Sequence, residues 1–77
     1  MLLEGDMHNL YISELKSQYR DQLVNKAIRC WKLKGLDADT IADKTSELES
    51  WIDRCGKNQF IAVFNQYDKT IKELGGG

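Results

Sequence analysis

The feature that most constrains the fold of this chain is its shortage of helix-breaking residues. The 77 residues contain no proline, and Gly35 is the only glycine between Gly5 and Gly56. Proline and glycine are the residues that most often interrupt a helix. Two long uninterrupted stretches, 6–34 and 36–55, therefore favour an all-α fold.

Apolar residues recur at steps of three and four in three consecutive segments. In segment 8–34 this face consists of Ile12, Leu15, Tyr19, Leu23, Ala27, Cys30 and Trp31. In segment 38–55 it consists of Ile41, Thr45, Leu48, Ile52 and Cys55, and in segment 58–74 of Phe60, Val63, Phe64, Tyr67, Ile71 and Leu74. Because a helix has 3.6 residues per turn, each spacing predicts an amphipathic helix. We expect a compact three-helix bundle, or a helical hairpin plus a third helix, with the first helix longest and the three apolar faces forming one core.

The first predicted helix carries signals for its C-terminal end. Lys32 and Lys34 favour the negative end of the helix dipole. Gly35 suits the left-handed residue that closes a helix, so we expect Leu36 to fold back onto Trp31.

The other two helices have start signals of the usual kind. Asp37 and Asp39 are candidate N-caps for the second helix, and Asn58 is a candidate N-cap for the third. The glycines at 75–77 cannot hold a fixed backbone unaided and predict a flexible tail. No connection is long enough to separate domains, so residues 1–77 are interpreted as one helical domain.

Composition excludes a membrane protein and a disordered chain. The longest apolar run, at 60–64, is far shorter than the roughly 20 residues of a membrane span. The start of the chain lacks the basic and apolar regions of a secretory signal, so we expect a cytoplasmic location and no membrane partner. The seven aromatic residues indicate a folded chain.

Residues with reactive side chains are few. His8 is the only histidine, and Cys30 and Cys55 are the only cysteines. Catalysis needs a nucleophile, base or metal held beside a second such group, and a zinc site needs about four ligands. No glycine-rich phosphate loop is present either. We therefore predict no enzymatic activity, no catalytic residue, no metal and no cofactor.

The two cysteines are predicted to lie far apart. In a hairpin that turns at 35–38, Cys30 is close to the turn and Cys55 is far from it, which separates them by about 20 Å along the helix axis. A disulfide requires Cα atoms within about 7 Å. We expect two buried thiols in a reducing compartment, with redox sensing as the alternative.

The charges are divided between the first two helices. Residues 14–34 hold six basic and two acidic side chains, a balance of +4, whereas residues 37–53 hold one basic and six acidic, a balance of −5. One interpretation is pairing between neighbouring helices. The other is that the basic first helix binds something acidic. The acidic ladder of Asp39, Asp43 and Glu47 is interpreted as solvated surface, with docking of a basic partner as its alternative.

A second stripe on the first helix suggests a contact surface. Leu10, Ser17, Val24 and Ile28 lie away from the main apolar face, flanked by Arg20 and Asp21. A single three-helix core is not expected to cover both faces, so we predict these six residues as a partner-binding site. The alternative is ordinary surface exposure. In a twofold dimer with antiparallel first helices, Arg20 of one copy would approach Asp21 of the other.

Two short segments are similar to known families. The stretch 41–45, followed by Ile52, resembles the start of a bacterial helix-turn-helix, but Ser46 and Glu47 stand where such motifs have glycine and an apolar residue, which favours a continuous helix. Residues 36–43 are similar to the bend of plasmid copy-number regulators of the Rop type, helical hairpins that dimerise and bind RNA with their first helices. The similarity covers eight residues, and this chain adds a third helix.

The sequence therefore predicts a protein that acts by binding. We expect a small regulatory or accessory protein of a bacterium or its mobile elements, which binds a partner protein or a second copy through the stripe at Leu10–Ile28. The alternative is a small DNA- or RNA-binding regulator that uses the basic first helix, although the net charge of −1 disfavours nonspecific nucleic-acid binding.

Overall fold

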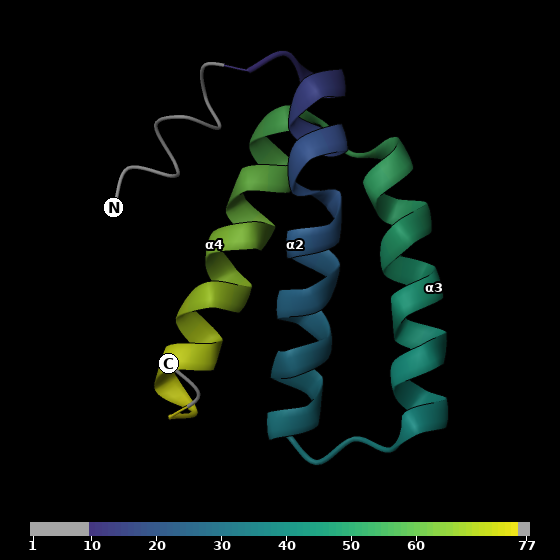
Figure 1. Ribbon diagram of the computed structural model, residues 1–77, viewed down its shortest axis with the longest axis vertical. Coiled ribbons are helices and arrows are strands. Elements are labelled where there is room, and N and C mark those ends of the chain that lie inside the picture. The colour runs from purple at the N-terminus through teal and green to yellow at the C-terminus, as the bar shows by residue number, and fades with distance from the viewer. Residues whose placement is uncertain (1–9, 76–77) are drawn as a thin grey trace.

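The computed structural model is an all-α three-helix fold, as the sequence predicts. It describes residues 10–75, which form α2 (Ile12–Leu33), α3 (Ala38–Arg54) and α4 (Lys57–Glu73), and α2 is the longest (Figure 1). The predicted start of the first helix near residue 8 is too early, because Tyr11 is the extended N-cap of α2. Residues 8 and 9, with His8 among them, lie outside the described residues.

The turn between α2 and α3 forms as the glycine signal predicts. Gly35 has φ +86°, its N–H donates to the carbonyl of Lys32 at 3.0 Å, and the N–H of Leu36 donates to the carbonyl of Trp31 at 3.1 Å. These two bonds define a Schellman motif, which returns the chain toward the helix it has just left. The Asp37 carboxylate then accepts from the N–H of Thr40 at 2.8 Å and caps α3.

The turn between α3 and α4 consists of only Cys55 and Gly56. Gly56, not Asn58, is the N-cap of α4, and its N–H donates to the Gln59 side chain at 3.0 Å. The prediction of Asn58 is wrong because the chain turns two residues earlier, with Cys55 already extended. Helix α3 runs without a break through Ser46, which confirms a continuous helix rather than a helix-turn-helix.

The three helices lie side by side in a thin layer. The molecule measures 35 × 27 × 15 Å, so it is flattened, with its smallest dimension less than half of its largest. Helix α2 is central and packs against both α3 and α4, whereas α3 and α4 have little direct contact with each other (Figure 1).

The core lies between α2 and its two neighbours. The largest side chains that are almost completely buried are Leu15, Leu23, Cys30, Ile52, Phe60 and Phe64. Two residues of the predicted core are exposed instead, Ile12 to 37% and Leu74 to 43%, because each lies in the terminal turn of its helix or just beyond it. Ile61, outside the predicted faces, is buried.

Both cysteines are buried and free. Burial raises the pKa of the Cys55 thiol, which keeps the thiol protonated and unreactive. Gly75 has φ +80° and donates to the carbonyl of Lys72, so the first residue of the predicted tail still closes α4. Residues 76 and 77 lie outside the described residues. Within residues 10–75, no helix is long and apolar enough to cross a membrane.

Candidate functional site

The stripe predicted on the first helix is partly covered by the fold. Leu10, Val24 and Ile28 are half-buried and pack against the core, whereas Ser17 and Asp21 are exposed. The expectation that a three-helix core would leave these apolar side chains uncovered holds only in part, because α2 lies between α3 and α4 and has neighbours on two sides. Partner binding by this stripe stays a prediction.

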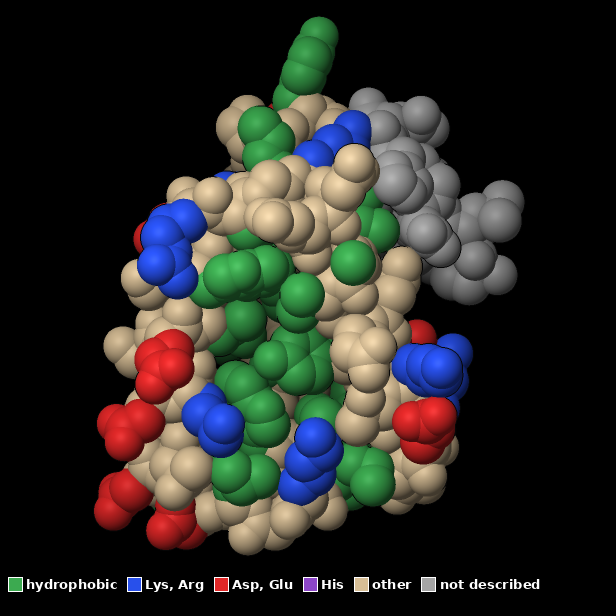
Figure 2. Space-filling model, turned by 180° about the vertical axis from the view of Figure 1, so that it is seen from behind, with side chains coloured by type: hydrophobic (Ala, Val, Ile, Leu, Met, Phe, Trp, Pro, Cys, Tyr) green, Lys and Arg blue, Asp and Glu red, His purple; other side chains and the backbone are tan. Residues whose placement is uncertain are grey.

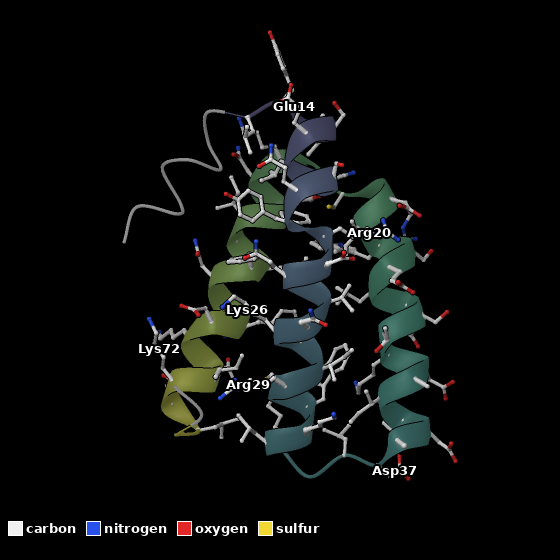
Figure 3. The ribbon with its side chains drawn as sticks, viewed as in Figure 1. Glu14, Arg20, Lys26, Arg29, Asp37 and Lys72 are labelled. Carbon is white, nitrogen blue, oxygen red and sulfur yellow. The ribbon has the colours of Figure 1, made fainter. Side chains whose placement is uncertain are left out.

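Arg20, the basic member of that stripe, is bound within the chain. Its guanidinium donates to the Asp53 carboxylate of α3 at 2.8 Å, on the α3 side of α2 (Figure 3). This hydrogen bond is the main cause that raises the pKa of Arg20 above its ordinary value. A pair with Asp21 of a second copy would therefore have to compete with Asp53.

A second cation of α2 is bound on the opposite side. The Lys26 ammonium lies 2.9 Å from the Asp68 carboxylate of α4 and 5.3 Å from the centre of the Phe64 ring. Lys72 also contacts Asp68, at 3.2 Å, and the two cations lower the pKa of that carboxyl group. The interpretation of the charges as pairing between the first two helices is thus confirmed for Arg20, whereas Lys26 pairs with the third helix.

A groove lies between α3 and α4, on the side of the molecule that faces away in Figure 1. Figure 2 shows apolar side chains gathered in a band along this face. The groove has a volume of about 660 Å³, and its apolar lining consists of Trp31, Leu48, Trp51, Val63 and Tyr67. It exists because α3 and α4 both pack on α2 and have little direct contact with each other.

One end of this groove contains a packed aromatic pair. Trp31 of α2 and Tyr67 of α4 meet edge to face, with ring centres 6.0 Å apart and planes at 87°. Lys44 of α3 places its ammonium 6.0 Å from the centre of the Trp31 ring. Burial raises the pKa of the Tyr67 hydroxyl, so the group stays neutral. Residues of all three helices therefore meet here and fix the floor of the groove.

The α3 rim of the groove is charged. It consists of Lys44, Glu47 and Arg54, all exposed. Among the described residues, none of the three takes part in an ion pair. The charges of Arg20 and Lys26 are matched within the fold, whereas those of this rim are available to a partner.

The lining of the groove is of mixed apolar and charged character. Within residues 10–75, no group of His, Cys, Asp and Glu side chains is arranged to hold a metal ion. The groove combines an apolar floor, two tryptophans and a charged rim, the combination by which proteins hold the apolar side chains of another chain.

Sequence reasoning assigned Val63 and Tyr67 to the core and gave Trp51 no role. Trp51 lies three residues after Leu48 and one before Ile52, at the edge of the apolar face of α3. A tryptophan at that position widens the apolar face beyond what one neighbouring helix covers. The width of this apolar face is the feature of the sequence that could have indicated a binding surface. The face lines a groove only because α3 and α4 stand apart.

The fold and groove define the class as an all-α three-helix protein with an open apolar groove. Comparisons of the chain with protein-family models, with curated protein sequences and with solved structures find no match.

Proposed function

We propose that this chain is a protein-interaction module without catalytic activity, and that its α3–α4 groove binds the apolar face of an amphipathic helix. The observation that carries the proposal is the groove itself, with Trp51, Val63 and Tyr67 half-buried along it. Half-buried aromatic and branched side chains lose their remaining contact with water when a second apolar surface covers them. Covering this groove is therefore favourable.

The shape of the groove fits a helix. The groove runs between α3 and α4, which both lie along α2. A further helix laid in the groove would therefore pack against both α3 and α4. Amphipathic helices bind such grooves through anchors spaced three and four residues apart. Tryptophan and tyrosine are enriched among the residues that dominate binding energy, and this groove offers Trp31, Trp51 and Tyr67.

Nucleic-acid binding by α2 is the less well supported alternative. Arg20 and Lys26 are engaged with Asp53 and Asp68, and Arg29 also has an interaction within the structure. Neutralising phosphates with these side chains would first require breaking such contacts. The net charge of −1 adds no general attraction to a polyanion.

The same proposal includes a regulatory or accessory role in a bacterial or phage cytoplasm. Two buried, free thiols fit a reducing compartment. In this role the chain acts by binding its partner in the α3–α4 groove.

The test is photo-crosslinking in cells that express the chain. Benzoylphenylalanine is placed at Ser50, which is exposed and lines the groove, at Ala42, which is exposed away from it, and at Asp21 of the α2 stripe. We expect a discrete protein adduct from position 50 that Trp51→Lys abolishes, and none from position 42. Adducts from position 21 alone would move the site to the stripe, and nuclease-sensitive adducts would support the nucleic-acid alternative.

A further inference from the structure

We infer that the groove's partner is a second copy of this chain, and that the two α3 helices lie antiparallel across the two grooves. The inference rests on the proposed function, because it takes the groove as a protein-binding surface. It adds the identity and orientation of the occupant, which follow from a pattern on α3.

The pattern is a stripe of six residues that continues the charged rim along the whole of α3. Its members recur at steps of three, four, three, four and three, and they are Asp37, Thr40, Lys44, Glu47, Trp51 and Arg54. Residues spaced in this way form one continuous seam when two helices pack side by side. Four of the six are exposed, and Thr40 and Trp51 are half-buried, so the seam is accessible along its length.

The charges of this stripe are complementary to the same stripe read backwards. Lys44 lies opposite Glu47 of the second copy when the two helices run antiparallel. Arg54 follows Lys44 by ten residues, and Glu47 follows Asp37 by ten residues, which is about 15 Å along each helix. The register that joins Lys44 to Glu47 therefore also joins Arg54 to Asp37. Twofold symmetry forms each of these pairs twice.

The uncharged members of the stripe fit the same register. Trp51 of each copy lies level with Thr40 of the other, near the 34–37 turn that follows Trp31. The bulky tryptophan thus meets a small side chain rather than a second tryptophan. A parallel twofold arrangement would instead place Lys44 against Lys44 and Glu47 against Glu47, which repel.

The dimensions of the molecule agree with this pairing. Each copy is only 15 Å thick but 35 and 27 Å in its other two directions. Two copies joined groove to groove form a two-layer particle of nearly even dimensions. A small domain buries a low fraction of its surface, so covering a second apolar face adds stability that one layer lacks.

The arrangement differs from a dimer built through the α2 stripe. That dimer needs Arg20 to leave Asp53, whereas Lys44, Glu47 and Arg54 have no ion pair to break among the described residues. The Asp37 carboxylate caps α3 and has its pKa lowered by the bond from Thr40, so it is ionised and retains acceptor capacity for Arg54.

The experiment measures mass by sedimentation equilibrium for the wild type and a reciprocal charge exchange. We expect wild-type chain to approach twice 8.9 kDa as concentration rises. Lys44→Glu alone places like charges together in two symmetric pairs and weakens association by at least about tenfold. Glu47→Lys alone does the same. Lys44→Glu combined with Glu47→Lys restores association, because both pairs re-form with signs reversed.

Asp43→Lys is the matched control, since it makes an equal change of charge one residue outside the stripe, and it should leave the mass at or above the wild-type value. Far-UV circular dichroism confirms that each variant is folded. A wild type that remains monomeric at millimolar concentration overturns the inference. A dimer insensitive to both single exchanges also overturns it. A monomer that still crosslinks another protein from position 50 keeps the proposed function and rejects the second copy as partner.

Discussion

Phe64 is the side chain through which the packing of α4 on α2 can be tested most directly. It is only 1% exposed. Its ring meets Tyr19 of α2 edge to face, at 6.1 Å between centres and 84° between planes, and the Lys26 ammonium lies 5.3 Å from the ring centre. One side chain therefore combines apolar burial, an aromatic pair and a cation–π contact.

The informative change is Phe64→Leu, which keeps most of the apolar volume and removes the ring. An edge-to-face aromatic pair contributes about 0.5–1.5 kcal/mol beyond burial. A partly exposed cation–π contact contributes about 0.5–1 kcal/mol. We expect a total loss of about 1–2.5 kcal/mol. Phe64→Ala costs about 3–5 kcal/mol, as much as the whole stability of a domain this small, and should leave the chain largely unfolded.

The assay is urea unfolding followed by far-UV circular dichroism. With a slope near 1 kcal/mol per molar urea, Phe64→Leu should lower the unfolding midpoint by about 1–2.5 M. Tyr11→Leu is the matched control, because it removes an aromatic ring that is 79% exposed, and its effect should stay within about 0.5 kcal/mol. Equal midpoints for the wild type and Phe64→Leu would refute the packing argument. The double change with Tyr19→Leu isolates the aromatic pair.

Three further predictions concern charge, backbone and thiols. Lys26 lowers the pKa of the Asp68 carboxyl from its ordinary value of 3.8, so the ionised carboxylate stabilises the fold above that pH and this stabilisation is lost as the pH falls through the lowered pKa. Between about pH 6 and about pH 3, the urea midpoint of Asp68→Asn should therefore fall less than that of the wild type. Gly35→Ala should cost about 1 kcal/mol in urea unfolding because φ is +86°. Cys30 and Cys55 should resist a thiol reagent in native protein and react fully in urea.

Each of these predictions has an outcome that contradicts it. Wild type and Asp68→Asn falling in parallel with acid would mean that the ion pairs with Lys26 and Lys72 contribute nothing. An unchanged midpoint for Gly35→Ala would mean that the turn is not held in the left-handed conformation. Rapid native labelling of both thiols would contradict their burial.

The helices were predictable from sequence because their signals are local. The spacing of apolar residues, Gly35 as a left-handed cap and Asp37 as an N-cap each act within a few residues, and the structure uses all of them. The errors at Asn58 and at the start of α2 are shifts of a helix end. At both ends the actual N-cap, Tyr11 or Gly56, makes no side-chain capping bond, so a search for polar capping residues does not find it.

The position of the groove was not predictable, because it depends on how far α3 stands from α4. The sequence indicates which face of each helix is apolar, but not that α2 occupies the middle of a layer. The same missing information explains the α2 stripe, where Val24 and Ile28 pack partly against the core. Partners across helices, such as Lys26 with Asp68, likewise depend on register between segments far apart in the chain.

The central position of α2 also determines which helices are expected to unfold locally. Since α3 and α4 pack on α2 and hardly on each other, either outer helix can detach while the other remains docked. Backbone amides of α2 are then exposed only by global unfolding, whereas those of α3 and α4 also exchange through partial opening. Because the α2–α3 hairpin closes a short loop, we expect it to form before α4 docks on α2 across a longer sequence separation. Hydrogen exchange should therefore be slowest in α2.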